Sequence, residues 1–304
     1  MRKDEFPTLL ILAVIFAISL IAPLISSWSI GDNYKNVSVD TYVNITYSKP
    51  VVLNVEIDTA SNNVTLSAGT TRSVLCNATI RDYNGYGDIN RTNATLWDNN
   101  NAVMSDPDDE NEHYFSNCTL NGNDGTYLSY WSCSFDVYYY ANNGSDWRCN
   151  VTTVDNYNFT ASGYNVTTLN PLYALNVTSE INYGDMAVED TSTNSETANI
   201  TSFGNMNINV SLYGYGGNEF TTGNGLAFIC EIGNISVGNE RYSLTDVAWA
   251  SMTNLTNESA LISGFTMPQR TTTEIINTTY WKLYVPPNPF GQCNGTVVFE
   301  AELP

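Results

Sequence analysis

Apolar and polar residues alternate one by one over much of this chain, and that is the period of a β-strand with one solvated face. The alternation is clear from Val37 to Thr46, from Ser73 to Ile80 and from Gly291 to Ala301. Within 51–170, no segment keeps the 3.6-residue apolar period of a helix. Turn residues separate the short strands at roughly 8–12-residue intervals, which predicts an all-β protein built from β-sandwiches.

The turn signals divide the 304 residues into four predicted parts. Residues 1–27 form a signal peptide or membrane anchor, and 28–50 form an N-terminal strand segment. Two tandem β-sandwich domains follow, over 51–170 and 171–304. The length of the chain suits two domains after an export segment.

The N-terminus has the order of features found in secretory signals. A charged start precedes an apolar run from Leu9 to Ile25, and serines follow the run. Pro23 would end a helix just before cleavage after Ser27 or Ser29. An uncleaved anchor is the alternative, because the run approaches the ~20 residues that span a bilayer. Both alternatives place the rest of the chain outside the cell.

The chain contains nineteen Asn-x-Ser/Thr triplets, and most of them continue the same alternation because their middle residue is apolar. This triplet is the acceptor for N-glycosylation of exported chains, although strand alternation alone also produces it. We expect several triplets to carry glycans on solvated strand faces. The acceptors singled out are Asn44, Asn63, Asn77, Asn93, Asn143, Asn150, Asn165, Asn176, Asn199, Asn209, Asn254 and Asn277.

The net charge of the chain argues against negatively charged partners. The chain carries 31 acidic against 11 basic residues, a net charge of −20, and has no basic stripe. Such a field repels nucleic acid and anionic lipid headgroups. We therefore expect an extracellular or cell-surface protein whose partners are envelope proteins, glycans or further copies of itself. Membrane contact is expected only through an uncleaved N-terminal segment.

Two cysteine-centred segments give the first domain a family resemblance. Residues 74–78 (VLCNA) and 146–151 (DWRCNV) resemble the core cysteine strands, usually called B and F, of immunoglobulin-like domains. The resemblance implies an inter-sheet disulfide between Cys76 and Cys149. It also implies that Trp97 or Trp131 packs on this bridge, while Trp147 stands where the family has a tyrosine.

The even number of cysteines in an exported chain indicates disulfides. Residues 114–120 and 127–140 are predicted to form a hairpin. Cys118 and Cys133 flank this hairpin, so we expect them to pair. Cys230 and Cys293 then remain to pair across the second domain. No Cys-x-x-Cys is present, and the single histidine, His113, cannot complete a zinc site with these spacings.

The second domain has three patterned segments, 203–212 (FGNMNINVSL), 280–286 (YWKLYVP) and 291–301 (GQCNGTVVFEA). They are similar to β-sandwich modules of prokaryotic surface and matrix proteins. Taken whole, the chain resembles archaeal exported, N-glycosylated surface proteins with immunoglobulin-like β-sandwich domains. That resemblance implies a place at the cell envelope and brings no established activity.

Catalytic motifs are missing from the sequence. There is no Gly-x-Ser-x-Gly elbow, and the Gly-rich stretch 214–217 lacks the spacing and lysine of a phosphate loop. We expect His113 to be a surface-loop histidine, and no motif fixes a glycosidase carboxylate pair. The expectation is a non-enzymatic protein with a structural or adhesive role at the envelope. A carbohydrate- or small-ligand-binding module is the alternative, and a secreted hydrolase is the third class.

No cofactor is expected except Ca²⁺, for which hard oxygen ligands cluster in two places. The first candidate set is Asp106, Asp108, Asp109 and Glu110. The alternative set is Asp82, Asn84 and Asp88. The alternative has the 1-3-7 spacing of a calcium loop, but Asn93 stands where such a loop has its bidentate glutamate. Solvated acidic loops without an ion are the simpler interpretation of both sets.

Overall fold

The structure, a computed structural model, describes residues 38–58 and 63–304. These residues form twenty β-strands and three short 3₁₀ turns, with no α-helix among them. The all-β fold predicted from the alternation is confirmed. All the strands of the described residues lie in one compact unit, residues 47–304.

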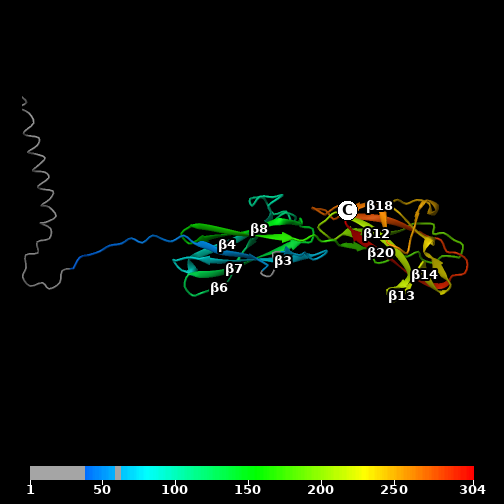
Figure 1. The fold of residues 1–304 in the computed structure, drawn as a ribbon, viewed down its shortest axis with the longest axis horizontal. Coiled ribbons are helices and arrows are strands. Elements are labelled where there is room, and N and C mark those ends of the chain that lie inside the picture. Colours follow the sequence, from blue (N-terminus) through cyan, green and yellow to red (C-terminus); the bar gives the residue numbers. More distant parts are fainter. Residues whose placement is uncertain (1–37, 59–62) are drawn as a thin grey trace, which may run out of the picture. The chain divides into compact units, whose positions relative to one another are not determined.

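The first sandwich has an immunoglobulin-like strand order. Its four-stranded sheet runs β1-β3-β7-β6 and its five-stranded sheet runs β2-β9-β8-β4-β5. Figure 1 labels β3, β6 and β7 of the first sheet and β4 and β8 of the second. The first sheet comprises β1 (Val51–Ile57), β3 (Thr71–Arg81), β7 (Leu128–Tyr138) and β6 (Thr119–Asn123). The second comprises β2 (Asn63–Val64), β9 (Thr160–Leu169), β8 (Gly144–Asp155), β4 (Ile89–Asp98) and β5 (His113–Asn117). These orders correspond to the A-B-E-D and G-F-C sheets of that fold, with β5 added beside β4.

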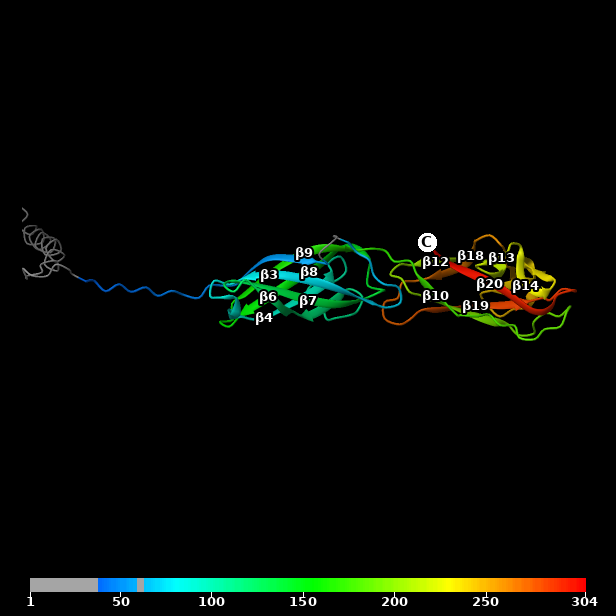
Figure 2. The ribbon, with the colours of Figure 1, turned by 90° about the horizontal axis from the view of Figure 1, so that it is seen from below.

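The core of this sandwich follows from the period of its strands. On β3, Val74, Cys76, Ala78 and Ile80 are buried, because every second side chain faces the opposite sheet. Figure 2 shows β3, β6 and β7 of one sheet together with β8 and β9 of the other. Burial of these apolar side chains is what holds the two sheets together.

The core tryptophan is Trp147, which corrects the expectation of Trp97 or Trp131. Trp147 is fully buried in the same cluster as the core cysteines, and its indole N–H donates to the Asn142 carbonyl at 2.9 Å. It precedes Cys149 by two positions on β8, so both side chains face the core. Trp131 packs at the margin of this cluster, and Trp97 is buried outside it.

The second sandwich also has two sheets. One runs β10-β11-β19-β16-β17, and the other runs β13-β12-β20-β14-β15 with β18 paired to β12. The first comprises β10 (Leu175–Val177), β11 (Glu196–Ser202), β19 (Ile276–Leu283), β16 (Glu240–Ser243) and β17 (Thr253–Asn254). The second comprises β13 (Thr221–Gly223), β12 (Ile208–Asn218), β20 (Phe290–Glu302), β14 (Leu226–Ile232), β15 (Asn234–Ser236) and β18 (Ala260–Met267). The 3₁₀ turns are η1 (Tyr86–Asp88), η2 (Val237–Asn239) and η3 (Trp249–Ser251).

Two predicted strands are corrected. The strand expected up to Thr46 does not form over the described residues 38–50, which are almost all exposed and pair with no strand of the described chain. Alternation alone does not stabilise a strand that has no partner. The strand expected from Tyr114 to Leu120 divides at Cys118: β5 joins β4 in one sheet, and β6 joins β7 in the other.

The predicted signal or anchor, residues 1–27, lies outside the described residues. Within 38–58 and 63–304, no helix has the length and apolar character needed to cross a membrane.

Candidate functional site

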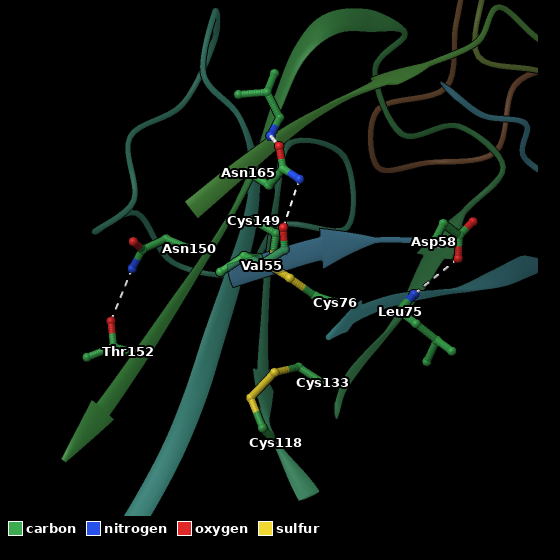
Figure 3. Close-up of a disulfide and its surroundings, with 11 residues drawn as sticks. Val55, Asp58, Leu75, Cys76, Cys118, Cys133, Cys149, Asn150, Thr152 and Asn165 are labelled. Carbon is green, nitrogen blue, oxygen red and sulfur yellow. Dashed lines mark hydrogen bonds between the residues drawn. A yellow bond between two sulfur atoms is a disulfide. The ribbon is translucent and has the colours of Figure 1, made fainter. Parts of the chain in front are cut away.

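The cysteines form three disulfides, with the pairing expected from the sequence. They are Cys76–Cys149, Cys118–Cys133 and Cys230–Cys293. The first joins β3 to β8 and therefore links the two sheets. Cys76 lies opposite Cys133 in the β3–β7 register, so the first two bridges are neighbours (Figure 3). Cys230 and Cys293 are partners on adjacent strands of one sheet, so the third bridge does not link the sheets of the second sandwich.

The acidic loop, residues 106–112 between β4 and β5, uses its central carboxylate for local structure. Asp109 Oδ1 accepts hydrogen bonds from the backbone N–H groups of Asn111, Glu112 and His113, at 3.0, 2.7 and 2.9 Å. A carboxylate that receives three N–H groups caps the turn in the way that an aspartate caps a helix. The backbone therefore already occupies this oxygen as a hydrogen-bond acceptor, which leaves it less available to a cation.

Two other acidic side chains of the loop also have partners. Asp106 Oδ2 accepts the Val103 backbone N–H at 2.8 Å, and Glu110 Oε2 accepts the Tyr140 hydroxyl at 2.6 Å. These contacts point the carboxylates to different neighbours. The loop does not form the kind of convergent acidic group that the described residues contain elsewhere.

His113 is buried, which corrects the expectation of a surface histidine. Only 2% of the residue is exposed. Its Nδ1 lies 3.2 Å from Asp108 Oδ1, and its Nε2 lies 3.1 Å from the Met104 carbonyl oxygen. Both partners belong to the segment before β5, so this segment folds over the imidazole and the ring anchors it.

The convergent group consists of Asp82, Asp88 and Asp155, which we call the carboxylate centre. Asp82 directly follows β3, Asp88 ends η1, and Asp155 ends β8. One carboxylate oxygen of each residue lies within 4.8 Å of an oxygen of both others. The β4–β8 register explains the approach, because it places Ile89, the neighbour of Asp88, opposite Asp155.

Backbone amides fix two of these side chains through one oxygen each. Asp82 Oδ1 accepts the Asn84 N–H at 2.8 Å. Asp155 Oδ1 accepts the N–H groups of Tyr157 and Phe159, each at 2.8 Å. Both aspartates are 0% exposed, so they are held rigidly inside the loops that they cap.

The remaining oxygens have no hydrogen-bond partner. Oδ2 of Asp82, Asp88 and Asp155 is buried and unpartnered in each case. Burial raises the pKa of Asp82; the Asn84 N–H opposes this, and the charges of Asp88 and Asp155 add to the increase. None of the ion pairs among the described residues involves the centre. Three hard anionic oxygens without cations of the protein's own suit a divalent metal ion.

Sequence reasoning named two of these three residues and missed Asp155. It also included Asn84, which the structure uses differently, since its side-chain oxygen accepts the Ser48 backbone N–H at 2.7 Å. Asp155 carries a weak local signal, an aspartate that begins a turn after a strand. Its approach to Asp88 depends on strand pairing, which no local pattern reports.

The second sandwich contains a cavity of about 450 Å³ beside Glu240. It shares Phe228 and Gly295 with an adjoining hollow of about 960 Å³. Glu240 is 3% exposed and accepts the Tyr183 hydroxyl at 2.9 Å. Burial raises the pKa of Glu240 to about 7, although the Tyr183 hydrogen bond lowers it. The pKa of Tyr183 is also raised by burial.

The predicted glycan acceptors differ in their access to solvent. The exposed acceptors are Asn44, Asn63, Asn165, Asn176, Asn199 and Asn254. The half-buried ones are Asn77, Asn93, Asn143, Asn209 and Asn277. Asn150 is buried, and its amide donates to Thr152 Oγ1 at 3.1 Å (Figure 3). The amide of exposed Asn165 donates to the Val55 carbonyl at 2.8 Å (Figure 3).

No protein-family model matches this chain, and no curated protein sequence matches it either. Solved structures that it resembles include a DUF4785 family protein from Legionella pneumophila, at 10% identity and a TM-score of 0.27, covering 81% of this chain and 46% of that one. This chain thus spans about half the length of the Legionella protein.

Two further solved structures resemble the chain to a similar degree. One belongs to the carbohydrate-binding modules of the β-sandwich superfamily, at 9% identity and a TM-score of 0.24, covering 85% of this chain and 99% of that one. The other is the C-terminal domain of the AgI/II polypeptide BspA from Streptococcus agalactiae, at 10% identity and a TM-score of 0.23, covering 84% and 100%. Likenesses of this degree carry no argument about function.

Proposed function

We propose that this protein is an exported, non-enzymatic component of the cell envelope with a structural or adhesive role. The observation that carries the proposal is the pairing of all six cysteines in disulfides. Disulfides form and persist in oxidising compartments, outside the cytosol. Two sandwiches that each contain such bridges suit a protein whose task is to keep its shape in contact with other molecules.

The surface supports the same role. Exposed acceptor asparagines lie on both sandwiches, for example Asn165 on β9 and Asn199 on β11. With only 14% charged residues and a net charge of −20, solubility depends on uncharged polar groups and, we propose, on glycans. The partners proposed are envelope proteins, glycans or further copies of this chain. The proposed lineage is that of the archaeal exported glycoproteins it resembles.

Fractionation of the native protein, with intact mass and glycopeptide mapping of the same sample, tests the proposal. We expect the protein in the envelope or extracellular fraction, with a mass above that of the polypeptide. Glycans are expected first at the exposed acceptors and not at buried Asn150. Recovery in the cytosol with free thiols would contradict an envelope role.

A second assay separates the function classes. Purified protein is expected to self-associate, or to bind cells or glycans, without turning over a substrate. Turnover of a polysaccharide or peptide that disappears when one Asp or Glu is replaced would favour the secreted hydrolase instead.

A carbohydrate- or small-ligand-binding module is the second candidate, and the cavity beside Glu240 favours it. The Glu240 carboxyl in the lining can orient a polar ligand, while Phe228 offers an apolar wall. Binding to a glycan panel that is weakened by Phe228→Ala, and unchanged by a substitution at exposed Phe220, would support this candidate. Equal binding by both variants would remove it.

A further inference from the structure

We propose that Asp82, Asp88 and Asp155 bind one Ca²⁺ ion, which joins the loop after β3 to the loop after β8. The inference concerns the first sandwich alone and does not depend on the proposed envelope role.

The spacing of the three carboxylates matches a shared ion. Ca²⁺ binds oxygen at about 2.3–2.6 Å, so two oxygens up to about 5 Å apart can contact the same ion. The carboxylate oxygens of the centre lie within 4.8 Å of one another. They reach this arrangement from distant parts of the sequence, through the pairing of β4 with β8.

The unpartnered oxygens are an independent indication of a ligand. Buried polar atoms in folded proteins almost always have a hydrogen-bond partner, and a buried unpaired charge is strongly unfavourable. Here three Oδ2 atoms are buried without one, on two aspartates that are fully buried and one that is half-buried. A bound cation would satisfy all three atoms at once.

The donor set selects the kind of ion. The centre consists of carboxylate oxygens alone, with no sulfur or imidazole nitrogen, and so does not suit zinc or copper. Three carboxylates exceed the one or two that Mg²⁺ usually takes from a protein, whereas Ca²⁺ accepts several together with carbonyl groups and water. The charge of −3 on the ligands also favours a divalent ion.

The ion would stiffen the place where the chain enters the first sandwich. The ring of Tyr157, two residues beyond Asp155, stacks on that of Tyr47 with 3.4 Å between centroids. The backbone N–H of Ser48 donates to Asn84 in the other loop. Asn156 also bridges the loops, since its backbone N–H and its side chain both donate to Asp88, at 2.9 and 3.2 Å. Calcium therefore links the two loops that hold the first residues of this unit.

Thermal unfolding of the full chain tests the site, with CaCl₂ and with EGTA at matched ionic strength. An ion that binds only the folded state stabilises it, and about a hundredfold excess over Kd should raise Tm by roughly 5–10 °C. Isothermal titration with CaCl₂ should give one ion per chain. MgCl₂ at the same concentration should give a smaller shift. An unchanged wild-type Tm and no binding heat would overturn the proposal.

Variants assign the ion to the centre. Asp88→Asn and Asp155→Asn should lose the calcium-dependent shift, while the matched control Asp108→Asn in the acidic loop should keep it. Asp155→Asn could fail to fold if its amide oxygen accepts the two backbone N–H groups more weakly than the carboxylate does. Asp88→Asn then still decides the question, because the Oδ1 atom of Asp88 has only the Asn156 side chain as partner. A full calcium response in Asp88→Asn, or its loss in Asp108→Asn, would refute the assignment.

Discussion

The acidic loop and the carboxylate centre of the first sandwich use the same chemical group in opposite ways. In the loop, Asp109 alone receives three backbone N–H groups from the residues that follow it. In the centre, Asp82 and Asp155 each give one oxygen to the backbone and keep the other buried and free. The acidic residues of the loop are close together in the sequence, but their carboxylates contact different neighbours. The aspartates of the centre come from separate parts of the sequence, and their carboxylates converge.

The difference has a simple cause. Carboxylates that are close in sequence can reach the N–H groups of their own turn, and these contacts consume their oxygens. Carboxylates brought together by strand pairing can cap separate turns through one oxygen and still keep the other oxygen buried without a partner, as Asp82 and Asp155 do. Density of acidic residues in a sequence is therefore a poor guide to where a cation binds.

Glu240, a buried carboxyl that lies apart from both acidic groups, extends this comparison. Its substitution should give the largest change in the free energy of unfolding. Glu240 has its pKa raised from 4.5 to about 7 by burial, so its protonated form is favoured in the folded state. Stability from this group is present below pH 4.5 and is lost as pH rises through about 7, amounting to about 3 kcal/mol. Glu240→Gln should remove this difference in urea unfolding measured across pH. An identical pH dependence in both proteins would show that the pKa of Glu240 does not differ between the folded and unfolded states.

At the centre, the sign of a mutation should depend on calcium. Without the ion, Asp88→Asn removes one of three neighbouring charges and should stabilise the fold by about 1–3 kcal/mol. With saturating calcium, the same variant should be less stable than the wild type, because it loses a ligand. Urea unfolding in EGTA and in CaCl₂ measures both. Destabilisation of equal size in the two buffers would indicate that Asp88 serves only local structure.

In the acidic loop, the effect of a substitution on the free energy of unfolding should not depend on calcium. Asp109→Ala leaves three backbone N–H groups without their acceptor and should cost about 1–2 kcal/mol. Asp109→Asn keeps an acceptor oxygen and should recover part of this loss. The loss of stability in each variant should be the same in EGTA and in CaCl₂. A loss that depends on calcium would indicate that the metal site lies in this loop.

The smallest effect is expected at Asp108. Its side chain is 56% exposed, although the His113 ring that it contacts is buried, so solvent screens the charge of this carboxylate. Asp108→Asn should therefore change the free energy of unfolding by less than about 0.5 kcal/mol. A larger loss, measured by the same unfolding experiment, would show that Asp108 holds the loop over His113.

Much of the fold could be predicted from the sequence, because strand period and cysteine spacing are local. The β3 and β8 strands and the hairpin of β6 and β7 follow from such patterns, and the resemblance to immunoglobulin-like domains implied the pairing of Cys76 with Cys149. β9 was missed. There Gly163 interrupts the pattern, and the side chain of Val52 packs so closely against it that an added Cβ would lie 2.8 Å away.

The site was less predictable, for a physical reason. Asp82 and Asp88 lie in one loop, and their spacing drew attention to them. Asp155 becomes their neighbour only when β4 pairs with β8. Whether a carboxylate oxygen is consumed by the backbone, as in Asp109, or left free, as in Asp82, depends on turn geometry that side-chain identity does not encode.

Native mass spectrometry of the calcium-loaded protein tests the central claim most directly. The comparison is between a variant with Asp82, Asp88 and Asp155 changed to Asn and a variant with Asp106, Asp108, Asp109 and Glu110 changed to their amides. The account predicts one bound Ca²⁺ in the wild type, one in the acidic-loop variant and none in the centre variant. Retention of the ion by the centre variant, with its loss from the acidic-loop variant, would contradict the account.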